Sequence, residues 1–269
     1  MNNTSTDSNS NVVVVKSSII TYPHGFSSRT GGVSSGIFDS LNLGMNRGDD
    51  QDKVIKNWDI FLKACDINTD RFVCGQQVHG NYVHIAAMDN ARPAYGQGKL
   101  IEADGYATNV PGVPLAVFTA DCVPVIMADE VNGVVASVHC GWRSTVADIE
   151  KSAVDAMVSL GAEVSNIKAA TGPSIGKCCF EVGAEVIEAA RDLLGELPGE
   201  LYSDSANEGK YMLNLPGVVK CRLMQLGLKD ENIEIIDECT MCHPERYWSH
   251  RYTKGERGSQ ANVVMIPEA

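Results

Sequence analysis

The sequence lacks an excess of basic residues and any long apolar run. It contains 22 Lys and Arg against 34 Asp and Glu, which gives a net charge of −12. Proteins that bind nucleic acid or a membrane surface usually present a basic face, so we expect neither partner. No apolar stretch approaches the roughly 20 residues that a membrane-spanning helix needs. The acidity therefore indicates solubility rather than a particular function.

An export signal, internal repeats and low-complexity linkers are also missing. Residues 1–11 are rich in Ser, Asn, Thr and Asp and show no basic-then-apolar pattern. We therefore predict a disordered tail over residues 1–11 and expect a cytoplasmic protein. Residues 12–269 show no abrupt change in composition, which predicts one domain. Nothing in the sequence indicates the oligomeric state.

Cysteine, by contrast, is plentiful, with nine residues at positions 65, 74, 122, 140, 178, 179, 221, 239 and 242. The number is odd, the chain is long and no export signal is seen. Reduced thiols and a metal ligand are therefore expected in place of a disulfide framework.

Patterns of apolar residues predict both strands and helices, and the two do not alternate regularly, which favours a mixed sheet in an α+β fold. The predicted helices span Asp50–Cys65, Thr145–Leu160, Ala184–Leu194 and Pro216–Leu226. The predicted strands span Val12–Val15, Ile19–Thr21, Phe72–Val78, Tyr82–Ala86, Leu115–Phe118, Val123–Met127, Val134–His139, Ile167–Thr171, Ile233–Ile236 and Val263–Ile266.

His79, Cys122 and His139 each lie at the end or the beginning of a strand-like run. Two imidazoles and one thiolate suit Zn²⁺, and three protein ligands would leave one coordination position open, as in catalytic zinc sites. A buried cysteine is more often a packing residue, and a lone histidine is more often a satisfied polar group. The loops at strand ends favour the metal interpretation.

Two further segments could bind an anion. Arg143 stands at the start of a predicted helix, where free N–H groups and a guanidinium suit an oxyanion. The alternative is an ion pair between Arg143 and Asp121. Ser28 and Arg29 precede a glycine-rich loop that could approach a phosphate or a sugar, although most such loops are only turns.

Cys239-Thr240-Met241-Cys242-His243 has the form of a c-type haem attachment motif. Haem attachment of this kind requires export, so we do not expect it. A structural zinc site would need a second CxxC pair, which the chain lacks. We expect packing cysteines here, and a turn at Cys178-Cys179. Tyr247–Arg251 is similar to an aromatic core strand with a polar end.

Several of these motifs occur in a fixed order. They are Thr30-Gly31-Gly32-Val33-Ser34, Ser40-Leu41-Asn42-Leu43-Gly44, Gln77-Val78-His79-Gly80, Ala103-Asp104-Gly105, Thr119-Ala120-Asp121-Cys122-Val123-Pro124-Val125, His139-Cys140-Gly141-Trp142-Arg143, Gly172-Pro173-Ser174-Ile175 and Cys239-Thr240. From about Val12 onward, the chain resembles the multicopper polyphenol oxidase or laccase-domain family. Members of that family are regarded as purine nucleoside phosphorylases that also act as adenosine deaminases and methylthioadenosine phosphorylases.

The resemblance implies a single-domain αββα sandwich that holds Zn²⁺, or Cu²⁺ in some members. It implies His79, Cys122 and His139 as metal ligands and catalytic residues, and purine nucleosides and phosphate as substrates. Substrate contacts would fall near Ser28, Arg29, Asn42 and Arg143. The chain departs from the family at Cys140, where Ala is usual, and we expect that thiol to pack on the opposite face of its strand. The stretch 252–260 is only loosely similar, so Arg251 and Arg257 receive no role from it.

The expected chemistry is phosphorolysis of the N-glycosidic bond, with the metal and Arg143 orienting phosphate. Adenosine deamination would instead use the metal to activate water, with Asp121 as a conceivable proton carrier. Three alternatives stay open. One is a laccase-like copper oxidase, for which only His24, His84, His243 and His250 would remain as further ligands. The others are a metal-free hydrolase that uses Cys122 and His139, and a non-catalytic haem or metal carrier.

Overall fold

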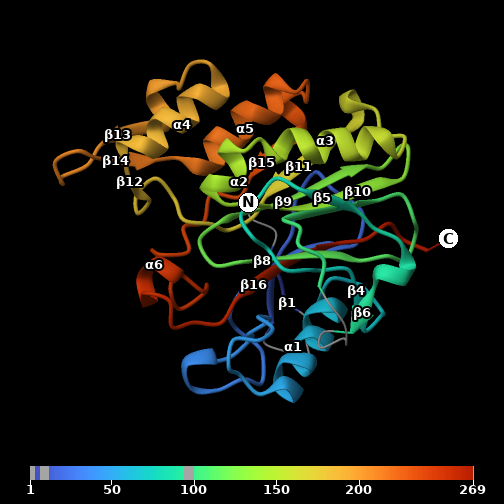
Figure 1. The fold of residues 1–269 in the computed structure, drawn as a ribbon. Helices are drawn as coiled ribbons and strands as arrows, with labels where there is room; N and C mark the ends of the chain where they lie inside the picture. Colours follow the sequence, from blue (N-terminus) through green and yellow to red (C-terminus); the bar gives the residue numbers. More distant parts are fainter. Residues whose placement is uncertain (1–3, 7–11, 94–99, 269) are drawn as a thin grey trace.

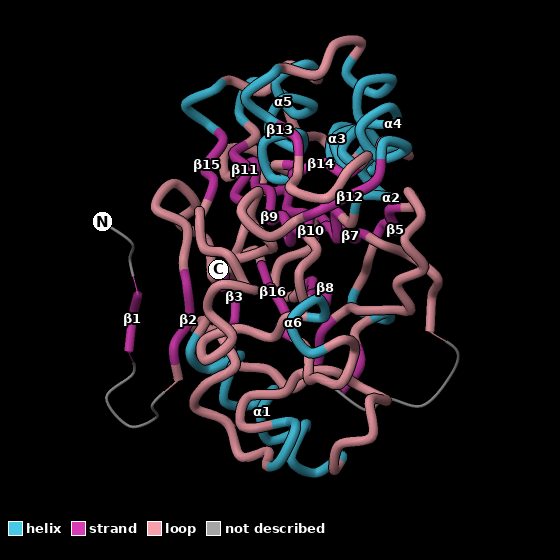
Figure 2. The backbone as a smooth tube through the Cα atoms, turned by 90° about the vertical axis from the view of Figure 1, so that its left-hand side faces the viewer, coloured by secondary structure: helices cyan, strands magenta, loops and turns pink. Residues whose placement is uncertain are grey.

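The computed structural model describes residues 4–6, 12–93 and 100–268, and it stacks two β-sheets between outer helices (Figure 1). The order of the layers is helices, a six-stranded sheet, a five-stranded sheet and a helix (Figures 1 and 2). This αββα arrangement agrees with the predicted fold class.

The six-stranded sheet carries the chemistry described below. Its order is β15 (Ile233–Ile235), β11 (Lys168–Thr171), β9 (Val123–Asp129), β10 (Val134–Cys140), β7 (Gly105–Thr108) and β5 (Val83–Ile85). The outermost pairs at both edges are parallel and the inner pairs are antiparallel. The sheet is therefore mixed, as predicted. Strands β9 and β10 are buried along their whole length, which explains their nearly continuous apolar sequences.

The five-stranded sheet is antiparallel, with the order β1 (Thr4–Thr6), β2 (Val13–Val15), β3 (His24–Ser27), β16 (Gln260–Val264) and β8 (Leu115–Thr119). Side chains from both sheets, among them Val117, Ile126 and Val135, form the core between them. Two smaller sheets complete the fold. One consists of β12 (Glu181–Gly183), β14 (Lys210–Leu213) and β13 (Tyr202–Asp204), and the other of β4 (Arg71–Phe72) and β6 (Arg92–Pro93).

Helices cover the outer faces of both sheets. A second core lies between the six-stranded sheet and α3 (Ile149–Ser159), α4 (Ala184–Leu194) and α5 (Leu215–Gln225). A third core packs α1 (Gln51–Ala64) against the other sheet through Trp58, Phe61 and Leu62. The short helices α2 (Trp142–Val146) and α6 (His250–Thr253) lie next to the site described below. Asp50 caps α1 by accepting a hydrogen bond from the Asp52 N–H at 2.9 Å, as its position predicts.

Most predicted elements are found within a residue or two of their expected ends, but several predictions were wrong. Ile19–Thr21 is not a strand. The helix predicted over Thr145–Leu160 is two helices, α2 and α3, because Asp148 adopts a left-handed conformation with φ of 67°. The Asp148 carboxylate binds the Arg222 guanidinium at 2.7 and 2.8 Å.

Other segments differ in detail. Strand β7 was not predicted, and the strand expected over Phe72–Val78 is reduced to the end of β4 followed by isolated bridges. Tyr247–Arg251 is not a core strand, because the two buried aromatic residues lead into α6. Within the predicted N-terminal tail, Thr4–Thr6 pairs with β2, and residues 1–3 and 7–11 lie outside the described residues.

Candidate active site

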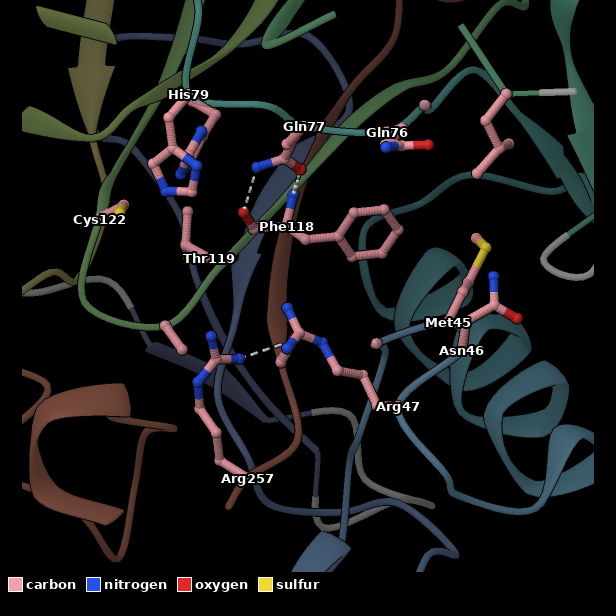
Figure 3. Close-up of a pocket in the computed structure, with 16 residues that line it drawn as sticks. Met45, Asn46, Arg47, Gln76, Gln77, His79, Phe118, Thr119, Cys122 and Arg257 are labelled. Atoms are coloured by element: carbon pink, nitrogen blue, oxygen red, sulfur yellow. Dashed lines mark hydrogen bonds between the residues drawn. The ribbon is translucent and has the colours of Figure 1, made fainter. Parts of the chain in front are cut away.

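The three predicted metal ligands meet at one end of the six-stranded sheet (Figure 3). His79 lies in the loop before β5, Cys122 in the turn between β8 and β9, and His139 near the end of β10. Their ligand atoms all lie within 4.8 Å of one another. The two imidazole rings meet edge to face, with centroids 4.8 Å apart. His139 is buried and His79 is exposed, so the group is open on one side.

A buried carboxylate holds both histidines in place. Oδ1 of Asp104 accepts a hydrogen bond from Nδ1 of His139 at 2.8 Å. The same carboxylate accepts the backbone N–H groups of residues 78, 79 and 80 at 3.0, 3.0 and 2.8 Å. These bonds fix the turn in which His79 has a φ of 59°. A carboxylate behind a ligating histidine sets which ring nitrogen carries the proton, so Nε2 of His139 is left free to bind a metal.

The glycine after Cys140 leaves space for the trio. A Cβ atom added to Gly141 would lie 3.0 Å from Cδ2 of His79 and 3.2 Å from Sγ of Cys122. Both distances are tighter than most Cβ contacts in proteins, so a side chain here would require His79 and Cys122 to shift by a few tenths of an ångström. Gly141 is also the N-cap of α2.

The trio carries separated charges even without a metal. Burial alone would raise the pKa of Cys122, but the charges and hydrogen bonds of His139 and His79 outweigh burial and bring it to about 6. For His139, burial opposes the charged form, while the Cys122 thiolate and Asp104 raise its pKa to about 9. A thiolate beside an imidazolium is therefore the preferred state at neutral pH.

These residues fit a single Zn²⁺ or Cu²⁺ ion. Two nitrogen donors and one ready thiolate lie close enough to share one ion, and the Asp104 carboxylate orients His139 from behind. A multicopper site fits less well. Among the described residues, the only other group suited to a metal is made of cysteines. His24, for example, is bound by the Ser17 N–H and contacts the Tyr22 carbonyl, away from the trio.

A cavity of roughly 400 Å³ lies in front of the trio, a size suited to a small organic ligand. His79, Cys122 and His139 line it together with Phe118 and residues of two loops (Figure 3). The Gln77 side chain donates to the Phe118 carbonyl at 2.8 Å and accepts the Phe118 N–H at 2.7 Å. This pair of bonds ties the His79 loop to β8 and sets the wall of the cavity.

Arg47 and Arg257 line the side of the cavity across from the trio (Figure 3). Burial and the nearby charge of Arg47 lower the pKa of Arg257 to about 10. Its Nη1 binds Ser259 Oγ and the Gly258 carbonyl, while its buried Nε has no partner among the described residues. Two neighbouring guanidinium groups with an unused donor favour an anion between them.

The substrate contacts predicted from the resemblance lie outside the residues that line this cavity. Arg143 is exposed and stacks on the Trp142 ring at 4.2 Å. Arg29 binds the carbonyls of Asp39 and Pro244 and stacks on Trp248. Ser28 is buried and contacts the Thr30 hydroxyl at 3.0 Å.

Asn42 is also buried, and it shapes the cavity indirectly. Its Oδ1 accepts hydrogen bonds from the N–H groups of Gly44 and Ser259, both at 2.9 Å. These two residues belong to the loops that carry Arg47 and Arg257. The amide of Asn42 therefore fixes the two loops relative to each other.

The Asp121 carboxylate does not bind Arg143, and both of its oxygens accept hydrogen bonds from other residues. Oδ1 accepts the Thr240 hydroxyl at 2.7 Å, and Oδ2 accepts the Arg251 N–H at 2.6 Å. With a φ of 90°, Asp121 holds the turn that presents Cys122. The Arg251 guanidinium turns away and binds the Glu181 carbonyl at 3.2 Å.

Sequence reasoning missed Asp104, Arg47, Arg257 and Gln77 as site residues. The sequence signals were present for two of them, because Ala103-Asp104-Gly105 and Gln77-Val78-His79-Gly80 are among the ordered motifs. Arg47 and Arg257 had no such signal, since both lie in loops whose meeting depends on the tertiary fold.

Comparison with known proteins connects this geometry to a family. A family model described as multi-copper polyphenol oxidoreductase laccase matches residues 23–267. The chain belongs to this family.

Relatives in the same family carry a more specific name. The purine nucleoside phosphorylase YlmD of Bacillus subtilis is 32% identical over 248 residues, which cover 91% of this chain and 88% of that protein. A purine nucleoside phosphorylase of Deinococcus radiodurans is 35% identical over 247 residues, which cover 91% of this chain and 89% of that protein.

Solved structures of this type share the fold. The crystal structure of YlmD from Geobacillus stearothermophilus superposes with a TM-score of 0.89 at 27% identity and covers 100% of both chains. The hypothetical protein YfiH of Bacillus licheniformis gives 0.85 at 29% identity, with 98% of both chains covered. In the part of this family member that the structure describes, no helix has the length and apolar character needed to cross a bilayer.

Proposed function

We propose that this protein is a metal-dependent purine nucleoside phosphorylase. The observation that carries the proposal is the placement of the His79–Cys122–His139 trio across one cavity from the Arg47–Arg257 pair. The trio would hold a metal ion with one coordination position open, and the arginine pair would bind a dianion such as phosphate. The printed names of the relatives supply the reaction class.

In the reaction, a phosphate oxygen forms a bond to C1′ of the ribose while the bond from C1′ to N9 of the purine breaks. The electron pair of the broken bond stays on the purine, which takes up a proton, and the products are the free base and ribose 1-phosphate. The ribose passes through an oxocarbenium-like state, so correct placement of the phosphate matters most.

Different residues of the cavity would serve different parts of this reaction. Arg47 and Arg257 would bind the phosphate oxygens, and the burial of Arg257 would strengthen its bond. The Phe118 ring would give the purine an apolar wall. Asn42 would keep the two arginine loops in register. A bound Zn²⁺ or Cu²⁺ would supply Lewis-acid stabilisation of negative charge at its open position.

The test is incubation of the metal-replete protein with adenosine, inosine, guanosine or methylthioadenosine, with and without phosphate. Chromatography should show free base and ribose 1-phosphate (its 5-methylthio derivative from methylthioadenosine) only when phosphate is present. Cys122→Ala should abolish both activity and one equivalent of bound metal. Cys221→Ala, a partly buried cysteine on α5, is the matched control and should keep both. No free base with the metal-replete protein would reject the proposal.

We also propose adenosine deamination as a side activity of the same site. Adenosine without phosphate should then yield inosine, and the loss of that product in Cys122→Ala would place both reactions at one centre. Inosine production that survives in Cys122→Ala would assign it to another site or to a contaminant.

A metal-free cysteine hydrolase is the second candidate, and one observation favours it. The lowered pKa of Cys122, the raised pKa of His139 and the Asp104 carboxylate behind that histidine form a Cys-His-Asp arrangement. Removal of the metal with a chelator distinguishes the phosphorylase from the hydrolase. Loss of nucleoside cleavage after chelation and its return with Zn²⁺ support the phosphorylase, whereas full activity of metal-free protein supports the hydrolase. Phenol-dependent oxygen uptake that requires copper would instead support a laccase-like oxidase.

A further inference from the structure

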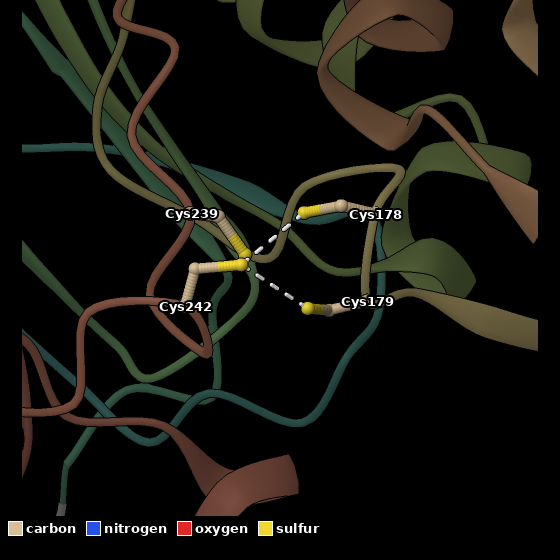
Figure 4. A group of neighbouring side chains, drawn as sticks. All are labelled: Cys178, Cys179, Cys239 and Cys242. Carbon is tan, nitrogen blue, oxygen red and sulfur yellow. Dashed lines mark hydrogen bonds between the residues drawn. The ribbon is translucent and has the colours of Figure 1, made fainter.

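Four cysteines outside the active site meet at the surface of the protein (Figure 4). Cys178 and Cys179 lie in the turn before β12, and Cys239 and Cys242 lie in the loop between β15 and α6. The two pairs are far apart in the sequence, with 64 positions between Cys178 and Cys242. The sequence predicts packing cysteines here and contains no second CxxC pair. The structure supplies the missing thiols as a vicinal pair.

The distances between the sulfur atoms suit a metal better than a disulfide. Sγ of Cys242 lies 3.5 Å from Sγ of Cys178 and 3.4 Å from Sγ of Cys179. All four sulfur atoms lie within 4.8 Å of one another. A tetrahedral zinc ion with Zn–S bonds of about 2.3 Å places its sulfur ligands roughly 3.8 Å apart, whereas a disulfide needs about 2.05 Å. All four residues are free thiols.

Packing does not explain the cluster. Cys178 and Cys242 are exposed, and Cys179 and Cys239 are only partly buried. A cysteine that fills a core is usually among the most buried residues of a protein. Cys179 and Cys239 touch the edge of a core, but Cys178 and Cys242 do not. Four thiols held together at a surface are typical of a ligand set for a soft metal ion.

The backbone around Cys239 is already arranged for a thiolate. The Gly176 N–H points at Sγ of Cys239 at a distance of 3.2 Å. Ser174 pairs with Cys239 in an isolated parallel bridge, with Ser174 N to the Glu238 carbonyl at 3.2 Å and Thr240 N to the Ser174 carbonyl at 3.0 Å. The two cysteine loops are therefore joined before any ion binds, which lowers the ordering cost of binding one.

We propose that Cys178, Cys179, Cys239 and Cys242 form a second metal site, a closed tetrathiolate site for structural Zn²⁺. It differs from the His79–Cys122–His139 group, because four protein ligands leave no position for a substrate. The site holds together the two loops that support the active site. Thr240, between the two ligands of one loop, binds Asp121 beside Cys122, and Ile175 N binds the Asp121 carbonyl at 2.8 Å.

Metal analysis of the purified full chain tests the proposal without using nucleoside turnover. We expect about two zinc ions per chain in the unmodified protein. Cys122→Ala should retain about one, Cys178→Ser should retain about one, and the double variant should retain none. Cys221→Ser is the matched control and should keep both ions. Because Cys178 is exposed, its replacement leaves the cores untouched.

A single zinc ion that disappears in Cys122→Ala would overturn the proposal, as would a zinc content that Cys178→Ser does not change. Cobalt substitution of Cys122→Ala gives a second measurement that does not depend on the folding of a cluster variant. Strong sulfur-to-cobalt charge-transfer absorption with tetrahedral bands is expected. Their absence, or an iron content with visible absorption, would overturn the zinc assignment. Failure of the phosphorylase assay would leave these results unaffected.

Discussion

The carboxylate of Asp104 and the imidazole of His139 form a buried hydrogen bond of 2.8 Å, and this bond organises the candidate active site. Asp104 has no exposed surface and also holds the turn that carries His79. One side chain therefore positions two of the three metal ligands. The third ligand, Cys122, is positioned separately by Asp121.

Replacing Asp104 with Asn should weaken metal binding by about 10- to 100-fold, a typical cost of losing an outer-shell carboxylate. The amide can no longer accept all the N–H groups that the carboxylate accepts. Asp129→Asn is a matched control, because Asp129 is equally buried and also accepts backbone N–H groups, but in the turn between β9 and β10. Competition with a chromogenic chelator measures both affinities. Equal zinc affinity in the two variants would contradict this role of Asp104.

Replacing Gly141 with Ala should reduce zinc content and activity with little loss of overall stability. The added Cβ atom would press on His79 and Cys122, at 3.0 and 3.2 Å, and would separate the ligands. Gly199→Ala is the control, since a Cβ atom there meets nothing within 4 Å. Zinc per chain and the thermal midpoint should be measured together. Full zinc occupancy in Gly141→Ala would show that the trio tolerates the extra atom.

The layers of this fold could be predicted from the sequence because they depend on local patterns. The apolar stripe of Val54, Trp58 and Phe61 forms the buried face of α1, and the apolar runs around residues 125 and 136 became the central strands. The break at Asp148 could not be predicted in this way, since an ion pair with Arg222, distant in sequence, accompanies its left-handed backbone.

The same distinction holds for the two metal-ligand groups. His79, Cys122 and His139 could be selected because each ends a recognisable motif next to a strand. The cluster of Cys178 and Cys242 could not, because its two loops are brought together by tertiary contacts such as the pairing of Ser174 with Cys239. Contacts between loops depend on the whole topology, and no spacing in the sequence records them.

Arg257→Ala and Arg47→Ala should each raise the KM for phosphate at least tenfold, with a smaller change in the KM for the nucleoside. Loss of one charge-assisted bond to an oxyanion costs about 1.5–3 kcal/mol, which corresponds to roughly 10- to 150-fold. Arg191→Ala, at an exposed position of α4, is the control for net charge. Initial rates measured over a range of phosphate concentrations give the KM of each variant.

Arg143→Ala belongs in the same series. The sequence predicted that Arg143 orients phosphate, whereas the structure places its guanidinium on the Trp142 ring, outside the cavity lining. We therefore expect a KM for phosphate within about twofold of that of the unmodified protein, since a stacked surface arginine contributes little there. A tenfold increase would restore Arg143 as a phosphate ligand.

Glu150 should make the stability of the protein fall as pH rises. It is buried in α3 beside Cys140 and Thr145, and burial raises its pKa from 4.5 to about 8. Between these two values the unfolded chain releases a proton that the folded chain retains. The free energy of unfolding should therefore fall as pH rises from about 4.5 to 8, by up to about 1.4 kcal/mol per pH unit from this group.

Glu150→Gln should remove that slope, because the amide does not titrate. The variant should gain stability relative to the unmodified protein as pH rises through this window, and the difference should level off above pH 8. Glu188→Gln, at an exposed position of α4, is the matched control and should leave the slope unchanged. Denaturant unfolding at a series of pH values measures all three proteins. Parallel stability curves for Glu150→Gln and the unmodified protein would mean that Glu150 is already ionised in the folded state, with water or a cation supplying the missing partner.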